Sequence, residues 1–305
     1  MISVVIPVFN RPDMVARAIR SVHAQRGIGT ADIEIVLVDD GSMPPLRVAA
    51  PDRRIRIVRS DHNLGAAAAR NLGVLAAKGD YLAFLDSDDV WRADKLACQL
   101  DAMRQIEQEN GATLHALVCN FYSPNRVTGR LQVRMLRSAN QLSDFASGCW
   151  FCPGSTLFIR RSAFNIVGPF DERLRRLEDL DWFIRFGQRS GQLHVLPYVG
   201  VIIAPSYSGR SDTVEQSTRA IEAKFNSCGE IALPPSAWRR LRAYLALERS
   251  AALLREGEHL KGLGCLLSSF WHKPRLQAAI EPFWQRSYDV PQDVLMTYGE
   301  MAGRA

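Results

Sequence analysis

The chain has 305 residues, of which 47% are hydrophobic, and a formal net charge of +6. This length and composition are ordinary for a soluble globular protein with a sizeable core. No apolar run approaches the roughly 20 residues that a membrane-spanning helix needs, and the first residues run directly into a strand pattern without a basic, cleavable leader. Six scattered cysteines favour reduced thiols over a disulfide framework. We therefore expect a cytoplasmic protein without an integral membrane helix.

The positive charge is concentrated in the middle of the chain. Residues 121–176 contain nine arginines and three acidic residues, a difference that equals the net charge of the whole chain. Such a segment suits a phosphorylated substrate, or peripheral contact with an anionic membrane at its inner face. A solvated protein surface is the alternative. No nucleic-acid-binding motif accompanies the charge, so we expect no nucleic acid partner.

The first 110 residues predict alternating strands and helices. Residues 2–8 form an apolar, β-branched run, a helical pattern continues to residue 22, and residues 33–38 form a second apolar run. This order is a βαβ unit, so the two strands should be parallel neighbours. The remaining elements expected here are a strand at 55–58, a helix over the alanines from residue 66, a strand at 81–85 and a helix at 95–109.

Polar residues follow three of these strands, at 9–10, 39–42 and 86–89. In open α/β sheets, ligands bind outside the carboxyl ends of the strands, so the three polar segments should converge on one crevice. Arg70 and Asn71 lie on the alanine-rich helix between the second and third segments, where Arg70 could present a bidentate cation to a diphosphate. Good helix propensity alone is the alternative explanation of this run.

Three carboxylates within four positions, Asp86, Asp88 and Asp89, end the apolar strand at 81–85. Carboxylates this close repel one another, and a hard divalent cation such as Mg²⁺ or Mn²⁺ relieves that repulsion. Mg²⁺ uses one or two carboxylates and completes its shell with water and substrate phosphates. The alternative is a polar turn in which Asp86 or Asp88 caps a helix that begins near Trp91.

Four motifs occur in a fixed order: IPVFN at 6–10, VDDGS at 38–42, NLG at 63–65 with ARN at 69–71, and FLDSDD at 84–89. Together they resemble the N-terminal half of the family-2 glycosyltransferases, over about residues 1–205. The resemblance implies a GT-A fold, that is, an α/β fold with a mostly parallel central sheet flanked by helices. It also implies a nucleotide-diphosphate sugar as donor, with a UDP-sugar as the first expectation, and a divalent metal, Mn or Mg, on the DXD motif.

The resemblance also implies roles for individual residues. Pro7, Phe9 and Asn10 would line the base pocket and Asp40 would bond the base, while Asp86 would approach the ribose or the metal. The full donor site implied is Pro7, Phe9, Asn10, Asp39, Asp40, Gly41, Ser42, Asn63, Gly65, Arg70, Asn71, Asp86 and Ser87. The implied metal ligands are Asp86, Asp88 and Asp89, with the choice between Asp88 and Asp89 as main ligand open.

The second half of the domain should bind the acceptor. We expect a strand at 114–121, an irregular, mobile excursion at 123–144, and a helix whose apolar face includes Leu180, Trp182 and Phe183. Glu178 and Asp179 lie at the start of that helix, either as a capping pair or as the general base for an acceptor hydroxyl. The resemblance assigns the base to Asp179, with Glu178 as its neighbour, and a single displacement then implies inversion.

The chain divides into three predicted parts. Residues 1–205 form the GT-A domain, with a nucleotide-binding half to about 110 and an acceptor-binding half from 111. Residues 206–232 read as a flexible loop, and 233–305 as a helical appendage with helices near 238–254 and 259–271. That appendage could pack on the sheet, pair with another chain, or lie on a membrane.

These observations predict a metal-dependent inverting glycosyltransferase. Its acceptor would be a hydroxyl of a glycan or lipid-linked molecule in cell-surface polysaccharide synthesis. We expect transfer of a single sugar, because the Gln-x-x-Arg-Trp motif of processive relatives is absent. A sugar nucleotidyltransferase is one alternative, although the first strand is followed by Phe9, Asn10 and Arg11 rather than by a glycine-rich phosphate loop. A non-catalytic nucleotide-sugar-binding protein is the other.

Overall fold

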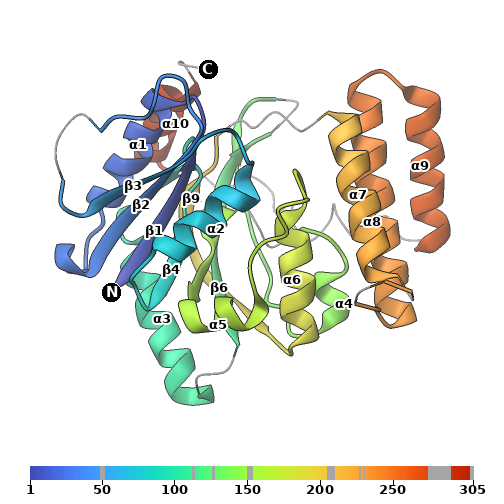
Figure 1. The fold of residues 1–305 in the computed structure, drawn as a ribbon, viewed down its shortest axis with the longest axis horizontal. Helices are drawn as coiled ribbons and strands as arrows, with labels where there is room; N and C mark the ends of the chain where they lie inside the picture. Colours follow the sequence, from blue (N-terminus) through green and yellow to red (C-terminus); the bar gives the residue numbers. More distant parts are fainter. Residues whose placement is uncertain are drawn as a thin grey trace.

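The computed structural model describes residues 1–48, 52–111, 114–125, 128–149, 154–204, 210–226, 228–229, 231–273 and 290–302. Within these ranges the chain forms a nine-stranded sheet flanked by helices (Figure 1). Eight strands follow the order β3-β2-β1-β4-β8-β6-β9-β5, and β7 pairs with β6.

One half of the sheet is parallel, as predicted. It contains β1 (Ile2–Val8), β2 (Ile33–Asp40), β3 (Ile55–Ser60) and β4 (Tyr81–Phe84). The backbone of β1 pairs with β2 on one side and with β4 on the other, both in parallel register. The carboxyl ends of β1, β2 and β4 therefore meet at one edge of the sheet, where the polar segments emerge.

The other half of the sheet is mixed. Its strands are β5 (Val90–Trp91), β6 (His115–Pro124), β7 (Leu131–Arg134), β8 (Phe158–Arg160) and β9 (Gln192–Ile202). β8 runs antiparallel to both β4 and β6, whereas β6 and β9 are parallel. The predicted strand at 114–121 is present, but β9 was not predicted, because its partly buried sequence lacks a clean apolar alternation.

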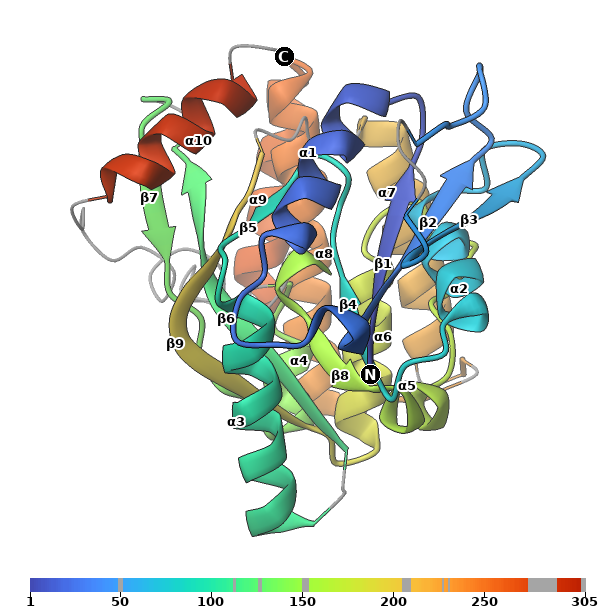
Figure 2. The ribbon, with the colours of Figure 1, turned by 90° about the vertical axis from the view of Figure 1, so that its left-hand side faces the viewer.

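Two layers of helices cover the sheet, because successive strand residues point to opposite faces. α1 (Pro12–His23) and α3 (Lys95–Asn110) pack on the face that includes Val4. α2 (Ala66–Ala76), α5 (Arg161–Val167) and α6 (Glu178–Gln188) pack on the face that includes Val5. Figure 2 shows α1 and α2 on opposite sides of the parallel strands.

The C-terminal region is helical, as predicted, and part of it belongs to the main core. It contains α7 (Ser211–Phe225), α8 (Pro235–Arg255), α9 (His259–His272) and α10 (Gln292–Ala302). Leu241 and Leu245 of α8 are completely buried in the same cluster as α6. α9 runs along the outer side of α8 at the edge of the molecule (Figure 1).

The structure differs from the sequence expectation in two segments. The predicted flexible loop at 206–232 contains α7, which forms because Val214, Ile221 and Phe225 lie at helical spacing and are buried. The predicted mobile excursion at 123–144 contains β7 and α4 (Leu142–Phe145). β7 is ordered by antiparallel pairing with β6, a contact that its polar sequence did not reveal.

No helix in the described ranges is long and apolar enough to cross a bilayer. α9 nevertheless exposes an apolar stripe, which consists of Leu260, Leu263, Leu267, Phe270 and Trp271. Leu260 and Trp271 are 88% and 86% exposed. This outward stripe lacks a covering element among the residues that the structure places.

Candidate active site

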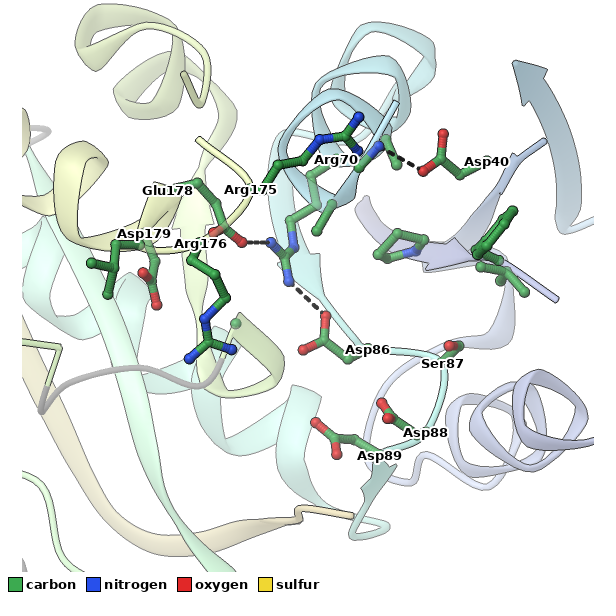
Figure 3. A pocket seen from close by; sticks show the side chains of 18 of the residues that line it. Asp40, Arg70, Asp86, Ser87, Asp88, Asp89, Arg175, Arg176, Glu178 and Asp179 are labelled. Atoms are coloured by element: carbon green, nitrogen blue, oxygen red, sulfur yellow. Dashed lines mark hydrogen bonds and ion pairs between the residues drawn. The ribbon is translucent and has the colours of Figure 1, made fainter. Parts of the chain in front are cut away.

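A cleft of about 640 Å³ opens at the carboxyl edge of the parallel strands. The ends of β1, β2 and β4 contribute Phe9, Asp40 and residues 86–89 to it, so the predicted convergence of polar strand ends is present. The opposite wall comes from the start of α6 and from α8. Figure 3 shows Asp86, Asp88 and Asp89, which follow β4, facing Glu178 and Asp179 across the cleft.

Asp40 holds the loop that forms one side of the cleft. Its Oδ1 accepts hydrogen bonds from the backbone N–H of Leu64 (2.8 Å) and the hydroxyl of Ser60 (3.0 Å), and its Oδ2 accepts one from the Gly65 N–H (2.9 Å). A short buried carboxylate thus satisfies backbone donors that would otherwise be costly to bury. Asn63 and Gly65 consequently line the cleft, as predicted.

Asp39, next to it, faces away from the cleft and organises the following loop. Its carboxylate accepts hydrogen bonds from the backbone N–H groups of Ser42 and Leu46, both at 2.9 Å, and pairs with Arg59. Burial raises the pKa of Asp39, but these hydrogen bonds outweigh it and lower the pKa below its usual value. Asp39 thus holds the loop after β2, and its predicted place in the donor site stays a prediction.

Four other predicted donor residues also lie outside the cleft lining: Asn10, Gly41, Ser42 and Asn71. The N–H of Asn10 donates to the Ser42 hydroxyl at 2.9 Å, which fixes the turn after β1. The Asn71 side chain exchanges two hydrogen bonds of 2.9 Å with the backbone of Phe170. These hydrogen bonds hold segments that border the cleft without lining it.

Arg70 joins the two walls of the cleft. It is only 8% exposed, and its two terminal nitrogens donate to Asp86 Oδ1 and Glu178 Oε1, each at 2.7 Å (Figure 3). Burial would lower the pKa of Arg70, but the charges of Asp86 and Glu178 raise it above its usual value. The guanidinium thus pairs with two carboxylates of the cleft, and its contact with a diphosphate stays a prediction.

Glu178 and Asp179 begin α6, directly after a sharp turn of the backbone. Leu177 adopts the left-handed conformation, with φ of 64°. Asp179 Oδ1 accepts hydrogen bonds from the Leu180 N–H at 2.8 Å and the Cys149 thiol at 3.3 Å. Burial and then the neighbouring Glu178 charge raise the pKa of Asp179 to about 6. A carboxylate with such a pKa can accept a proton near neutral pH.

The three acids after β4 have different surroundings. Asp89 is buried, and its two oxygens accept hydrogen bonds from the Ser155 hydroxyl (2.5 Å) and the Ala204 N–H (2.9 Å). Burial, with the charges of Asp86 and Asp88, raises the pKa of Asp89 well above its usual value. Asp88 pairs with Arg11 at 2.6 Å, and burial followed by the Asp86 charge raises the pKa of Asp88. The first helix after these acids is α3, which starts at Lys95, so neither Asp86 nor Asp88 is its cap.

The residues after β4 fit a divalent cation with few protein ligands. Asp86 and Asp88 each keep an oxygen that is not used in their arginine pairs, whereas both oxygens of Asp89 are occupied. In the described part of the chain, no three His, Cys, Asp or Glu side chains form a metal cluster. Two hard oxygen ligands, completed by water and phosphate, are the set that Mg²⁺ prefers.

Several cleft residues were not predicted as site residues, namely Arg11, Cys149, Arg175, Arg176, Tyr244 and Glu248. Arg175 donates to Asn63 Oδ1 at 3.1 Å, whereas the Arg176 guanidinium is drawn between Asp179 and Asp86 in Figure 3. The basic stretch around residue 175 was visible in the sequence, but its position was not. Tyr244 and Glu248 come from α8, far from the motifs, and only the fold brings them to the cleft.

Comparison with known proteins agrees with this architecture. The sequence model for Glycosyl transferase family 2 matches residues 3–167. The succinoglycan biosynthesis protein ExoO of Rhizobium meliloti (strain 1021) is 39% identical over 202 residues, which cover 64% of this chain and 54% of that protein. An Escherichia coli protein, UDP-Glc:alpha-D-GlcNAc-diphosphoundecaprenol beta-1,3-glucosyltransferase WfgD, is 35% identical over 137 residues, 42% of this chain and 53% of that protein. This chain thus spans about half the length of these relatives.

The crystal structure of S. aureus TarS has a similar fold, with a TM-score of 0.57 at 18% sequence identity. The match covers 91% of this chain and 50% of TarS. A structure of S. aureus TarS 1-349 in complex with UDP-GlcNAc matches with a TM-score of 0.51 at 16% identity, over 90% of this chain and 76% of that one. The predicted GT-A fold is confirmed.

Replacing Arg70 should destabilise the fold, because its removal leaves Asp86 and Glu178 facing each other without a cation. We expect Arg70→Ala to lower the free energy of unfolding by about 3–5 kcal/mol, measured by urea denaturation. Arg175→Ala, an exposed arginine on the same cleft, is the control and should change stability by less than about 1 kcal/mol. Equal effects of the two substitutions would contradict the bridging role of Arg70.

Proposed function

The chain belongs to Glycosyl transferase family 2, and from this membership and the geometry of the cleft we propose that it transfers a single sugar from a nucleotide-diphosphate sugar to a hydroxyl of a glycan or lipid-linked acceptor. The observation that carries the proposal is the arrangement of Asp179 across the cleft from Asp86 and Asp88. The wall with Asp86 and Asp88 then binds the leaving group, and the wall with Asp179 binds the attacking hydroxyl.

The donor nucleotide fits the wall built by β1 and β2. Pro7 and Phe9 offer apolar surface for a base, and Phe9 is 41% exposed although aromatic. The oxygens of Asp40 are used by the loop at 63–65, so the base would meet that loop as well as the carboxylate. The TarS complex with UDP-GlcNAc supports a UDP-sugar as donor.

Asp86 and Asp88 would hold a divalent cation, Mn²⁺ or Mg²⁺. When bound, such an ion supplies positive charge to the departing diphosphate. Arg11 and Arg70 fix the orientation of these two carboxylates through their ion pairs. Arg176 adds a protein cation between the two walls, where the negative charge of the leaving group develops.

The transfer follows from the position of Asp179. The oxygen of an acceptor hydroxyl attacks the anomeric carbon while Asp179 Oδ2 takes the hydroxyl proton. The bond between the anomeric carbon and the diphosphate oxygen breaks, and the nucleoside diphosphate leaves with that electron pair. One displacement on the face opposite the leaving group inverts the anomeric centre. Because the pKa of Asp179 is about 6, the carboxylate form predominates at neutral pH.

The names of the relatives support a role in polysaccharide synthesis. ExoO is a succinoglycan biosynthesis protein, and the name of WfgD specifies a diphosphoundecaprenol-linked acceptor. A lipid-linked acceptor would require access to the cytoplasmic face of a membrane. The exposed apolar stripe of α9, with Lys261 beside it, supports peripheral contact with that surface.

The role of Asp179 predicts a pH dependence. We expect kcat/KM for transfer to fall about tenfold per pH unit below pH 6, because protonated Asp179 cannot accept the hydroxyl proton. Raising the pKa of a carboxylate makes the folded state bind that proton more tightly, so this group favours folding at acidic pH and loses that contribution as pH rises towards 6. The low-pH loss of activity therefore does not arise from unfolding caused by Asp179.

The matching variant is Asp179→Asn, which keeps the shape but cannot act as a base. Transfer, followed as nucleoside diphosphate released from UDP-, GDP- and dTDP-sugars with a cell-envelope lipid extract, should fall by roughly 100- to 10,000-fold. Nucleotide binding should be unchanged. Full activity of Asp179→Asn would contradict the assignment, and formation of a nucleotide sugar from a sugar phosphate would instead indicate a nucleotidyltransferase.

Metal removal is expected to abolish transfer. EDTA-treated protein should regain activity with Mn²⁺ or Mg²⁺, and Asp88→Asn should require a higher metal concentration because one oxygen ligand is weakened. Asp80→Asn, which alters an exposed carboxylate outside the cleft, is the control. Transfer that persists in EDTA would contradict the metal proposal.

The α9 stripe predicts binding to lipid. Trp271→Ser should reduce co-sedimentation with phosphatidylglycerol vesicles several-fold, because it removes the most exposed aromatic side chain of the stripe. Leu75→Ser is the control, since Leu75 is 84% exposed on α2, away from α9. Equal loss in both variants would contradict a specific role of α9.

A further inference from the structure

α8 places two polar side chains, Tyr244 and Glu248, in the wall of the active cleft. They lie four residues apart, and so on one face of the helix. The Tyr244 hydroxyl donates a hydrogen bond to Glu248 Oε1 at 2.7 Å. None of the ion pairs within the described ranges involves Glu248. Both residues lie beyond the 3–167 segment that defines the family match.

Packing of α8 fixes the positions of Tyr244 and Glu248, and both lie near Asp179, the proposed base. Leu241 and Leu245 anchor α8 in the core on either side of Tyr244. The Tyr244 ring packs over Gly148, where a Cβ would lie 2.5 Å from the ring. The next residue, Cys149, donates to Asp179 at 3.3 Å. A ligand on Tyr244 and Glu248 is therefore next to the group that would activate its hydroxyl.

The hydrogen-bonding capacity of the pair defines the chemistry of its ligand. The Tyr244 hydroxyl donates its only hydrogen to Glu248. Burial raises the pKa of Tyr244 well above its usual value, so the hydroxyl stays protonated. The backbone of Cys149 hydrogen-bonds the Tyr244 oxygen, so what remains for a ligand is the second oxygen of Glu248, which is an acceptor. A ligand must donate a hydrogen bond to that oxygen. Hydroxyl groups can do so, whereas a phosphate lacks the protons and is repelled by the carboxylate.

We propose that Tyr244 and Glu248 form a subsite that binds hydroxyl groups of the acceptor sugar and orients it toward Asp179. The inference rests on the proposed function and extends it, because it assigns acceptor selection to the C-terminal helix rather than only to residues 111–205. Phosphate groups of a lipid-linked acceptor would then lie elsewhere in the cleft, away from the Glu248 carboxylate.

The test measures sugar binding without requiring turnover. The full chain, saturated with UDP and Mn²⁺, is screened by saturation-transfer NMR against methyl α-glycosides of glucose, galactose, mannose and N-acetylglucosamine. Each glycoside that binds is titrated against Glu248→Gln and Tyr244→Phe. Glu248→Gln keeps an acceptor for the Tyr244 hydroxyl but removes the charge, so the fold should be preserved.

The inference predicts that Glu248→Gln raises the glycoside Kd by roughly tenfold, while the Kd for UDP is unchanged. Glu258→Gln, which makes the same change at a half-exposed site outside the cleft, should bind both ligands as the wild type does. Unchanged glycoside affinity in Glu248→Gln, or no glycoside binding to the wild type, would overturn the subsite. If the wild type does not bind UDP, the proposed donor function is overturned instead, so the two failures are distinguishable.

Discussion

The arrangement of the cleft depends on the buried ion bridge of Arg70. Its guanidinium pairs with Asp86 at the end of β4 and with Glu178 at the start of α6, so one side chain connects the two walls. Burying the Arg70 guanidinium costs free energy unless both carboxylates stay paired with it. Loss of the arginine would likewise leave two carboxylates without a cation. The separation of Asp86 from Glu178, and with it the spacing of the two walls, is therefore held by this buried ion bridge.

The acidic residues in and around the cleft differ because their surroundings differ. Asp39 and Asp40 accept backbone hydrogen bonds and act as scaffolding for loops, even though they follow each other in one motif. Asp89 is enclosed by Ser155 and Ala204, whereas Asp88 keeps an oxygen toward the cleft. Asp179 is desolvated beside Glu178, which gives it the proton affinity of a base. Identical side chains thus differ in function because their partners differ.

The sequence predicted the parallel half of the sheet and the convergence of its polar ends, because buried parallel strands are continuous apolar runs and βαβ connections fix their direction. It also predicted that Asp40, Asp86 and Asp179 would share one cleft, through the family resemblance. It could not distinguish Asn71, which bonds Phe170, from a ligand-facing residue. Nor could it find Tyr244 and Glu248, since a helix face carries no local sign of the distant loop that it meets.

The backbone at Leu177 makes the position of Asp179, the proposed base, depend on the hydrophobic core. A leucine in the left-handed region costs about 1–3 kcal/mol, and burial of its side chain among the α6 residues offsets that cost. The direction in which Glu178 and Asp179 leave the chain is consequently set by how well an apolar side chain fits its neighbours. The orientation of these two carboxylates at the cleft is thus tied to the packing of an apolar side chain in the core.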